Sequence, residues 1–332
     1  MNIDFKRYKI AVATVTYGNR WHLLSQVLYS IKDNDLVGDI IVVDNGSEED
    51  ITSLVKNLKS NKIKVIKTGK NLGSAGGFYI AIKTAYENSK CDFIFLLDDD
   101  NIVEKGCLED LLNIYMKLGN NKNNCLKAYK YNNKSEIILS KYSNLLDLEN
   151  SFFNFHFKKK IFIKKYKNKS KIISVNGVAY SGFFFHKSIL CEIGFPEEKM
   201  VLYNDDTEYT LRFKYNGKRI FLCKNCRLRD LEKSWHHNLK NINPFFYTKT
   251  NLIRSMYGIR NRAYIEKKYL VKNKFIYFFN FIAYFIYNAI KAYFFLERNR
   301  ESIKKIHIFL KLVIEGWRGE FKTKIDLNNI NL

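Results

Sequence analysis

Apolar runs and segments of helical spacing alternate along the first third of the chain. Four runs rich in β-branched and aromatic residues have the character of buried strands, namely residues 10–16, 39–43, 63–68 and 93–97. Between them, and again after the fourth, apolar residues recur every three or four positions, which is the spacing of an amphipathic helix. This alternation predicts an α/β domain with a parallel sheet that is covered by helices on both faces.

Polar and glycine residues gather where each predicted strand ends. The segments concerned are Thr16–Asn19, Asp44–Ser47, Asn71–Gly77 and Asp98–Asp100. Any one of them is typical of an ordinary turn, since Asn-Gly and Gly-Gly are turn formers. In a parallel sheet, however, ligands bind outside the carboxyl ends of the strands. Four such segments at one edge of the sheet therefore predict a binding site there.

The alternating pattern is lost and then regained in the second third of the chain. Residues 119–172 are rich in Lys and Asn, and we interpret them as an insertion. Further on, Asp206 predicts the N-cap of a helix that runs to about Asn216, with Gly217 as its C-terminal stop. We expect a catalytic domain over residues 1–240, followed by an aromatic, basic and helical region over residues 241–332.

The net charge narrows the choice of partners. With 56 Lys and Arg against 33 Asp and Glu, the formal net charge is +23, which attracts nucleic acid, nucleotide phosphates or an anionic bilayer. Much of the excess lies in Asn-rich stretches such as Lys158–Lys171, which suggests a solvated insertion. We therefore expect no nucleic acid partner. Basic and aromatic residues do interleave over Phe152–Lys171, so a nucleic-acid-binding module stays an alternative.

The most apolar stretch of the sequence is Lys274–Glu297, in the aromatic C-terminal region. It is long enough to raise the question of a membrane span, but Asn280, Asn288 and Lys291 interrupt it and Tyr is frequent. Three interpretations stay open: a helix packed within the protein, a helix lying on a membrane surface, and a true span.

The cysteines and the first residues indicate a reducing compartment. Six cysteines are widely scattered, and the charged opening "MNIDFKRYKI" does not have the character of a signal peptide. We expect reduced thiols and a cytoplasmic protein. Cys223 and Cys226 form one C-x-x-C pair, but no second pair follows at zinc-ribbon spacing. A structural zinc ion is therefore disfavoured.

Two acidic clusters suggest chemistry. Asp98–Asp100 follow a predicted strand directly, and consecutive carboxylates at a strand end can hold Mg²⁺ or Mn²⁺ through oxygen. The second cluster, with Asp205, Asp206 and Glu208, opens a predicted helix. Helix capping together with a Glu208–Arg212 pair would explain part of it. Capping needs only one acid, however, so one of these carboxylates is a candidate general base.

A histidine pair, His236 and His237, follows Trp235 and forms a third candidate cluster. Histidine is a frequent metal ligand, although a buried structural histidine is the more common case. Taken together with the two acidic clusters, the pair predicts an additional metal ligand.

The order of these motifs resembles that of the family 2 glycosyltransferases over about residues 8–262. That family has the GT-A fold, a Rossmann-like nucleotide-binding mixed sheet flanked by helices, with a DxD metal motif; the C-terminal helical region would be an appendage. The resemblance rests on the motifs "TVTYGNR", "IIVVDNGS", "NLGSAGGF", "FLLDDDN", "SGFFFHKSILCEIGFPEE", "YNDDTEYTLR" and "WHH". The tract "MYGIRNRAY" (Met256–Tyr264) is similar to one in the branch that adds galactofuranose or rhamnose to bacterial surface glycans.

The resemblance implies a role for each candidate residue. Those that would bind the donor nucleotide are Thr16, Tyr17, Arg20, Asp44, Asn71, Gly73, Gly76, Gly77 and Asp99. Asp98 and Asp100 would bind Mn²⁺ or Mg²⁺, with His236 as the third ligand and His237 as the alternative, because the register is ambiguous by one. Asp206 would be the base that deprotonates the acceptor hydroxyl, and Asp205 would support it or bind the acceptor.

The resemblance also implies an inverting, metal-dependent hexosyltransferase. Its donor would be a UDP- or dTDP-linked sugar, and its acceptor a glycan or polyprenyl-linked precursor in capsule or lipopolysaccharide biosynthesis. The enzyme would then work as a peripheral protein at the inner face of the cytoplasmic membrane, held by its basic and aromatic helices. The sequence does not indicate an oligomeric state.

A nucleotidyltransferase is the alternative among enzymes, because it also combines carboxylates and Mg²⁺ on an α/β sheet. Such an enzyme commonly carries a Gly-rich loop with Lys or Arg after its first strand. Here "TYGNRWH" follows that strand, with a single glycine.

Overall fold

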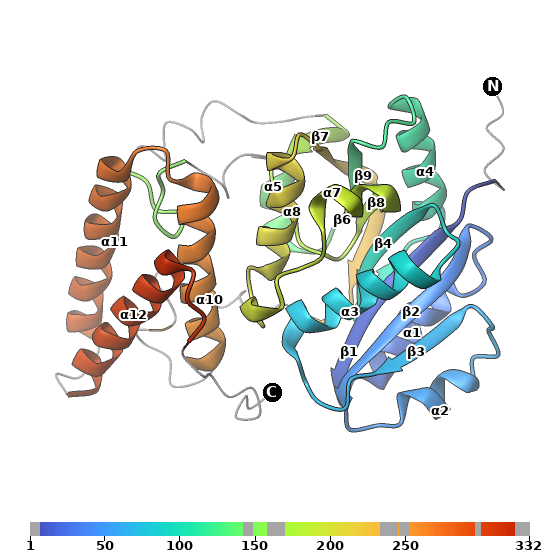
Figure 1. Ribbon diagram of the computed structural model, residues 1–332, viewed down its shortest axis with the longest axis horizontal. Helices are drawn as coiled ribbons and strands as arrows, with labels where there is room; N and C mark the ends of the chain where they lie inside the picture. Colours follow the sequence, from blue (N-terminus) through green and yellow to red (C-terminus); the bar gives the residue numbers. More distant parts are fainter. Residues whose placement is uncertain are drawn as a thin grey trace. The chain divides into compact units, whose positions relative to one another are not determined.

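The computed structural model describes residues 7–141, 149–157, 170–232, 245, 252–295 and 300–322. The chain forms two compact units, drawn in Figure 1. The first, here called the sheet unit, comprises Met1–Ser143, Asn168–Glu198 and Asp206–Ser234. The second, here called the helical unit, comprises Asn144–Lys167, Lys199–Asp205 and Trp235–Leu332. The helical unit thus includes two segments that precede the expected boundary at residue 240.

The sheet unit is built on a mixed sheet, in which the described strands pair in the order β3-β2-β1-β4-β8-β6-β9-β5, with β7 also paired to β9. The strands are β1 (Ile10–Gly18), β2 (Val37–Ser47), β3 (Ile63–Lys67), β4 (Phe93–Asp98), β5 (Asn101–Val103), β6 (Asn124–Lys130), β7 (Ile172–Val175), β8 (Phe183–His186) and β9 (Arg219–Asp230). Strands β1 to β4 are mutually parallel, whereas β8 runs antiparallel to β4 and β6.

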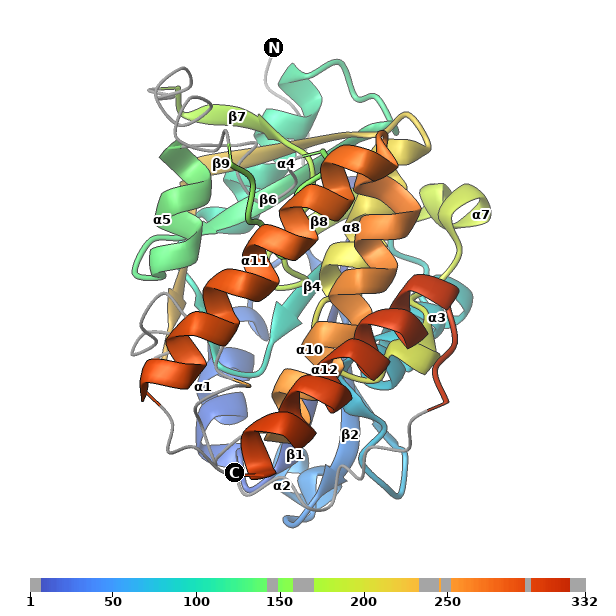
Figure 2. The ribbon, with the colours of Figure 1, turned by 90° about the vertical axis from the view of Figure 1, so that its left-hand side faces the viewer.

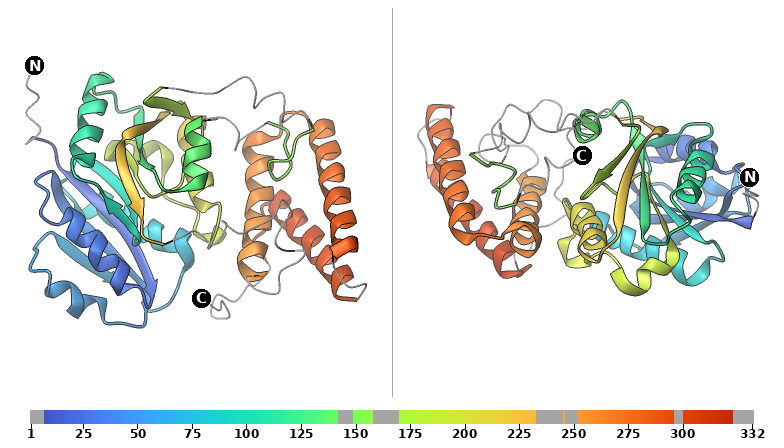
Figure 3. Two further views of the ribbon diagram at one scale, coloured as in Figure 1. Left: turned by 180° about the vertical axis from the view of Figure 1, so that it is seen from behind. Right: turned by 90° about the horizontal axis from the view of Figure 1, so that it is seen from above.

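Helices cover both faces of this sheet. Those of the sheet unit are α1 (Trp21–Ile31), α2 (Ile51–Lys56), α3 (Gly73–Asn88), α4 (Cys107–Lys117), α5 (Lys134–Lys141), α7 (Leu190–Ile193) and, except for its first residue, α8 (Asp205–Tyr215), with a 3₁₀ turn at Lys187–Ile189. A second 3₁₀ turn, Glu198–Met200, begins in the sheet unit and ends in the helical unit. Helices α1, α2 and α4 share one hydrophobic core with the sheet, and α3, α7 and α8 share the other. Helix α3 lies on the face turned to the viewer in Figure 1, and α1 lies on the reverse face, seen in Figure 3.

The predicted alternation of four strands and helices at the start of the chain is confirmed. Its physical basis is the period-two pattern of β1, where Ile10 and Val12 enter one core and Ala11 and Ala13 enter the other. A strand that is buried on both faces carries apolar residues at every position, as β1 does from Ile10 to Ala13.

The expectation that residues 119–172 form an insertion is wrong for one segment. Strand β6 (Asn124–Lys130) lies inside the sheet between β8 and β9, and its Leu126 and Ala128 are fully buried. The Lys- and Asn-rich composition concealed this strand, because Lys127 is a buried strand residue whose charge is paired with Glu136. A lysine that is neutralised by tertiary structure has no local signature in the sequence.

The helical unit contains α10 (Leu252–Ile265), which continues as a π-helix over Glu266–Leu270, α11 (Lys274–Phe295) and α12 (Arg300–Arg318). The three α-helices are drawn in the foreground of Figure 2. They enclose a core of aromatic and aliphatic side chains that includes Phe152 and Phe309. One face of α11 therefore packs within the protein. Among the described helices, α11 included, none combines the length and the apolar character needed to cross a membrane.

Candidate active site

Parallel pairing brings the polar strand ends together at one edge of the sheet. Strand β1 lies between β2 and β4, with Thr16 opposite Asp44 and Val15 opposite Asp98. The chain then turns through Asp99 and Asp100 into β5. The structure therefore brings Thr16, Asp44 and the aspartate triplet to one rim, as the sequence pattern predicts.

Asp99 is held by Arg20. The guanidinium Nε lies 3.1 and 2.9 Å from the two carboxylate oxygens of Asp99, and one terminal nitrogen donates at 2.8 Å. The other terminal nitrogen donates to Glu232 at 2.7 Å, and the Arg20 guanidinium also lies over the Tyr17 ring at 5.3 Å. The Asp99 side chain is only 6 % exposed. In this structure Asp99 and Arg20 thus bind each other and fix the turn that presents Asp98 and Asp100.

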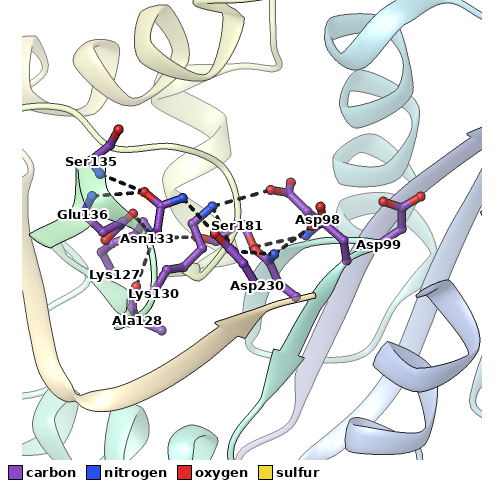
Figure 4. A network of polar contacts seen from close by, with 12 residues as sticks. Asp98, Asp99, Lys127, Ala128, Lys130, Asn133, Ser135, Glu136, Ser181 and Asp230 are labelled. Atoms are coloured by element: carbon purple, nitrogen blue, oxygen red, sulfur yellow. Dashed lines mark hydrogen bonds and ion pairs between the residues drawn. The ribbon is translucent and has the colours of Figure 1, made fainter. Parts of the chain in front are cut away.

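A second network surrounds Asp98 (Figure 4). The Lys130 ammonium lies 4.0 Å from an oxygen of Asp98 and 3.7 Å from Asp230, at the end of β9. Asn101 donates to Asp100 at 2.7 Å and to Asp230 at 2.8 Å. Asn133 donates to the other oxygen of Asp230 at 2.8 Å. Lys130 is therefore a built-in counter-charge for carboxylates that come from two different strands.

The same network continues into the core through Ser181. Its hydroxyl accepts from the Asp98 amide at 3.2 Å and donates to the Asn101 side chain. Its carbonyl accepts from Lys127 at 2.6 Å, and Lys127 also pairs with Glu136 at 2.8 Å. Burial lowers the pKa of Lys127, and Glu136 opposes that shift. Because such buried polar groups are costly unless they are paired, this arrangement favours one fixed geometry for the Asp98 backbone.

Positive charge compensates Asp98 and Asp100 only in part. Asp98 lies beside Lys130, and an oxygen of Asp100 lies 3.4 Å from the Arg20 guanidinium, yet the pKa values of both carboxyls are raised. Partial burial raises the pKa of Asp98 to about 6, with repulsion from Asp99 and Asp206 acting in the same direction and Lys130 opposing it. Burial, followed by repulsion from Asp98 and Asp99, raises the pKa of Asp100 to about 7. Because the charged forms of both carboxyl groups are disfavoured, a cation bound beside them would stabilise their ionised state.

Asp206 joins this group from the start of α8. Its carboxylate accepts from the Thr207 amide at 2.6 Å and from the Thr207 hydroxyl at 3.3 Å. Burial raises the pKa of Asp206, while the bonds to Thr207 and the charge of Lys130 oppose that shift. Asp206 and Asp98 are thus near enough to affect each other electrostatically, although they lie about a hundred positions apart in the sequence. Asp205, the first residue of α8, is buried.

The predicted donor-binding residues lie around the ends of β1 and β2. Asp44 is 5 % exposed and accepts from the Ser47 amide at 2.9 Å. The Asn71 side chain accepts from the Gly73 amide at 2.8 Å, which shapes the turn into α3. Thr16 Oγ1 and Ser47 Oγ are buried and have no hydrogen-bond partner among the described residues. Polar atoms of this kind are candidates for bonds to a ligand.

Gly76 and Gly77 have a packing role inside α3. A Cβ atom at Gly77 would lie 2.5 Å from Val15 and 3.4 Å from the Asn45 amide, so α3 approaches β1 as closely as it does only with glycine there. At Gly76 a Cβ would lie 2.7 Å from Leu72. This packing explains both residues without a ligand, and their role toward a donor stays a prediction.

The predicted third metal ligand, His236 or the alternative His237, lies outside the described residues. Within the described ranges, no group of three His, Cys, Asp or Glu residues is arranged to hold a metal ion. The carboxylates of Asp98 and Asp100 stay candidates for a cation, although Asp98 lies beside Lys130 and Asp100 lies 3.4 Å from the Arg20 guanidinium.

Sequence reasoning missed three charged residues of this rim: Lys130, Asp230 and Glu232. Lys130 and Asp230 each end a strand, which is the signal that identified Asp44 and Asp98. That signal could not be used for Lys130 because β6 was interpreted as part of an insertion.

Comparisons with known proteins concern the family and the fold. The model of the family described as "Glycosyl transferase family 2" matches residues 11–193, which is more than half of the chain. No curated protein sequence matches the chain.

The solved structures of similar fold include complexes with UDP and with UDP-GlcNAc. Staphylococcus aureus TarS 1–349 in complex with UDP-GlcNAc has 16 % sequence identity and a TM-score of 0.54, covering 93 % of this chain and 81 % of that one. The complex of the same TarS segment with UDP has 15 % identity and a TM-score of 0.54, covering 93 % of this chain and 80 % of that one. GalNAc-T7 with UDP, GalNAc and Mn²⁺ has 11 % identity and a TM-score of 0.50, covering 79 % of this chain and 52 % of that one. The expected GT-A fold is confirmed.

Proposed function

The chain belongs to glycosyl transferase family 2, and from that premise we propose that it inverts the anomeric centre of a nucleotide sugar while transferring the sugar to a hydroxyl group. The proposal rests on one observation: Asp98 and Asp206, which are far apart in the sequence, lie near enough to Lys130 for its charge to lower the pKa of both. One acidic cluster comes from a strand end and the other from a helix start, so a donor and an acceptor can be served from different elements.

The donor nucleotide would lie along the ends of β1 and β2. Asp44 would hold the uracil or thymine ring, and the orphaned hydroxyl of Thr16 supports a polar ligand beside it. UDP- and dTDP-sugars both suit such a site. The TarS complexes hold UDP and UDP-GlcNAc, which supports a nucleoside diphosphate as the leaving group here. In the present structure Arg20 and Asp99 bind each other, so we assign them to shaping this site.

Asp98 and Asp100 fit a divalent cation such as Mn²⁺ or Mg²⁺. Both supply hard oxygen donors, and burial together with repulsion from neighbouring carboxylates raises the pKa of both. A bound cation would offset the negative charge that develops on the diphosphate as it leaves. His236 or His237 would complete the ligand set.

Asp206 would act as the general base. The acceptor oxygen forms a bond to the anomeric carbon, the bond from that carbon to the diphosphate oxygen breaks, and the diphosphate keeps the electron pair. The hydroxyl proton passes to the Asp206 carboxylate. A raised pKa suits this step, because a carboxylate that is more basic than usual accepts the proton more readily.

We further propose a hexosyltransferase that adds galactofuranose or rhamnose to a precursor of capsule or lipopolysaccharide. The tract Met256–Tyr264 supports this branch of the family. The acceptor would be a glycan carried on a polyprenyl lipid, which would bring the enzyme to the inner face of the cytoplasmic membrane.

The exposed face of α11 supports an anionic membrane surface as a partner. Phe275 is 79 % exposed, and further exposed apolar side chains follow at Phe278, Phe279, Ile286, Tyr287 and Ile290, which fall on one side of a helix. Residues 241–332 carry seventeen Lys and Arg against six Asp and Glu, and α11 contains no acidic residue. A basic helix with an apolar face suits the interface of an anionic bilayer.

The test of the proposed function is a donor screen. Purified protein with Mn²⁺ is titrated with a panel that includes UDP-galactofuranose, dTDP-rhamnose and UDP-N-acetylglucosamine, and both thermal stability and donor hydrolysis are followed. We expect at least one member to stabilise the protein and to be hydrolysed slowly. The proposal fails if no nucleotide sugar does either while the protein stays folded.

A further inference from the structure

The loop that leads into α8 has an unusual backbone. Between Met200 and Asp205, three residues other than glycine have a left-handed φ, namely +63° at Val201, +64° at Tyr203 and +61° at Asn204. This conformation is disfavoured for most side chains, and most of all for a β-branched residue such as Val201. Strained backbone of this kind persists only where surrounding contacts hold it.

The contacts that hold the loop come from the tract Met256–Tyr264 on α10. The side chain of Asn261 is fully buried. Its amide nitrogen lies 2.8 Å from the carbonyl oxygen of Met200, 3.0 Å from that of Leu202 and 2.9 Å from that of Tyr203. The amide nitrogen of Asn261 thus lies within hydrogen-bond distance of three carbonyl oxygens of the strained segment.

Two further contacts join the same pair of segments. The Arg260 guanidinium approaches the carbonyl oxygens of Lys199 at 3.4 Å and Met200 at 3.5 Å. In the opposite sense, the Asn204 side chain donates to the carbonyl of Gly258 at 3.2 Å. Loop and helix are therefore connected by donors from both sides.

We propose that Asn261 is a positioning residue for the general base. The segment that it clamps ends at Asp205, and the next residue in the chain is Asp206. An amide at position 261 supplies N–H donors to converging carbonyls, which neither an alanine nor a carboxylate can do. The inference rests on the proposed role of Asp206. On this proposal, the tract Met256–Tyr264 holds the backbone that precedes Asp206 in a fixed conformation.

A merely structural role predicts a different result from a positioning role. If Asn261 only stabilises the helical unit, its loss lowers the melting temperature and leaves turnover by the folded protein unchanged. If it positions Asp206, its loss lowers kcat while the affinity for UDP stays the same, because the nucleotide does not depend on the base. A displacement of about 1 Å at a reacting group can cost about 100-fold in rate.

The experiment compares Asn261→Ala with Asn280→Ala. Asn280 is a matched control: it is also fully buried in the helical unit, and it donates to the carbonyl of Asn150 at 2.8 Å. The probe is the nucleotide sugar of the donor panel that the wild-type protein hydrolyses fastest, and UDP affinity is measured by calorimetry. We expect kcat to fall about 100-fold in Asn261→Ala at unchanged UDP affinity, and to stay near the wild-type value in Asn280→Ala. An unchanged kcat in Asn261→Ala, or an equal fall in both variants, overturns the proposal.

A second variant decides the matter if Asn261→Ala does not fold. Asn204→Gly removes the bond to Gly258 and keeps the left-handed backbone accessible, since glycine adopts it freely. A fall in kcat at unchanged UDP affinity supports the clamp, and an unchanged kcat overturns it. Asp206→Asn tests the role of Asp206 separately from that of Asn261. If this variant keeps full turnover, Asp206 is not the general base and the proposed function is refuted on that point. If it is inactive while both clamp variants are fully active, only the clamp is refuted.

Discussion

The ammonium group of Lys130 lies 4.0 Å from a carboxylate oxygen of Asp98. Lys130 is 11 % exposed and ends β6, while Asp98 is 38 % exposed and ends β4. Burial opposes the charge of Lys130, but Asp98 and Asp230 outweigh it and raise the pKa of the ammonium group. The rim thus carries a permanent positive charge next to the residues proposed to bind a second, exchangeable one.

Replacing Lys130 should lower the stability of the metal-free protein and increase the stabilisation that Mn²⁺ provides. In Lys130→Met, Asp98 and Asp230 lose their counter-charge, so we expect the free energy of unfolding to fall by about 2 kcal/mol without metal. That value is below the cost of breaking a fully buried pair because Asp98 is partly exposed. Mn²⁺ should stabilise the variant more than the wild type, since the competing cation is gone. Thermal melts with and without Mn²⁺ at about pH 8, where these carboxylates are ionised, measure both effects.

Lys64→Met is the matched control for that substitution. Lys64 also pairs with an aspartate, Asp39 at 2.7 Å, but it is 49 % exposed and belongs to β3. An exposed pair contributes about 0–1 kcal/mol, so little stability should be lost and the response to Mn²⁺ should not change. Equal responses of both variants to Mn²⁺ would refute the placement of the cation beside Lys130.

The raised pKa values of Asp98 and Asp100 predict how stability depends on pH. Their folded-state pKa values of about 6 and about 7 lie above the value of about 3.9 expected in the unfolded chain. Between about pH 4 and 7 the folded state therefore binds more protons than the unfolded state, so stability falls as the pH rises. Mn²⁺ needs the ionised carboxylates, so its stabilising effect should be small near about pH 5 and large near about pH 8.

The double variant Asp98→Asn with Asp100→Asn tests this dependence. It removes both titrating groups, so the fall in stability across the window should flatten and the response to Mn²⁺ should vanish at every pH. Differential scanning calorimetry over a pH series, with and without Mn²⁺, gives both quantities. A double variant that still responds to Mn²⁺ as the wild type does would exclude these two carboxylates as ligands.

Much of this rim was accessible from the sequence because local patterns encode it. Strands that are buried on both faces are apolar throughout, so the point where β1, β2 or β4 ends is visible as a change to polar residues. Parallel pairing then places Thr16, Asp44 and Asp98 at one edge. The start of α8 was predicted approximately, since acidic residues favour a helix N-terminus. The predicted N-cap, Asp206, lies inside the helix, which begins at Asp205.

What stayed hidden depends on partners that only the tertiary structure brings together. Lys127 is an acceptable core residue only because Glu136 and the Ser181 carbonyl meet its charge. In the same way, Asn261 looks like an ordinary polar residue of a helix until the loop at Met200 is folded against it. Neither relation has a local pattern, because the fold alone brings the two groups together.

Removing the proposed base should abolish transfer and leave nucleotide binding intact. Asp206→Asn keeps the size of the side chain and removes its ability to take a proton, and a general base contributes about 10²–10⁴ in rate. We expect a loss of that order in kcat with unchanged affinity for UDP. Glu208→Gln is the control: Glu208 lies on the same helix, and its carboxylate pairs with Arg212 at 2.7 Å. It should lose stability but not turnover, and the opposite ranking of the two variants would argue against Asp206.

The exposed face of α11 predicts membrane binding that depends on aromatic residues. In the triple variant Phe275→Ser, Phe278→Ser and Phe279→Ser, each lost ring removes about 1.5 kcal/mol of apolar transfer energy, or about tenfold in partitioning. These side chains are exposed already, so the melting temperature should not fall. Co-sedimentation with vesicles of phosphatidylglycerol and phosphatidylcholine measures the effect, and raising the salt concentration should weaken binding of the wild type.

The double variant Tyr29→Ser and Tyr215→Ser is the control for this prediction. It removes exposed rings from the sheet unit and should bind vesicles as the wild type does. If the wild type stays in solution with anionic vesicles at low salt, or if both variants lose binding equally, α11 is not the membrane-binding surface.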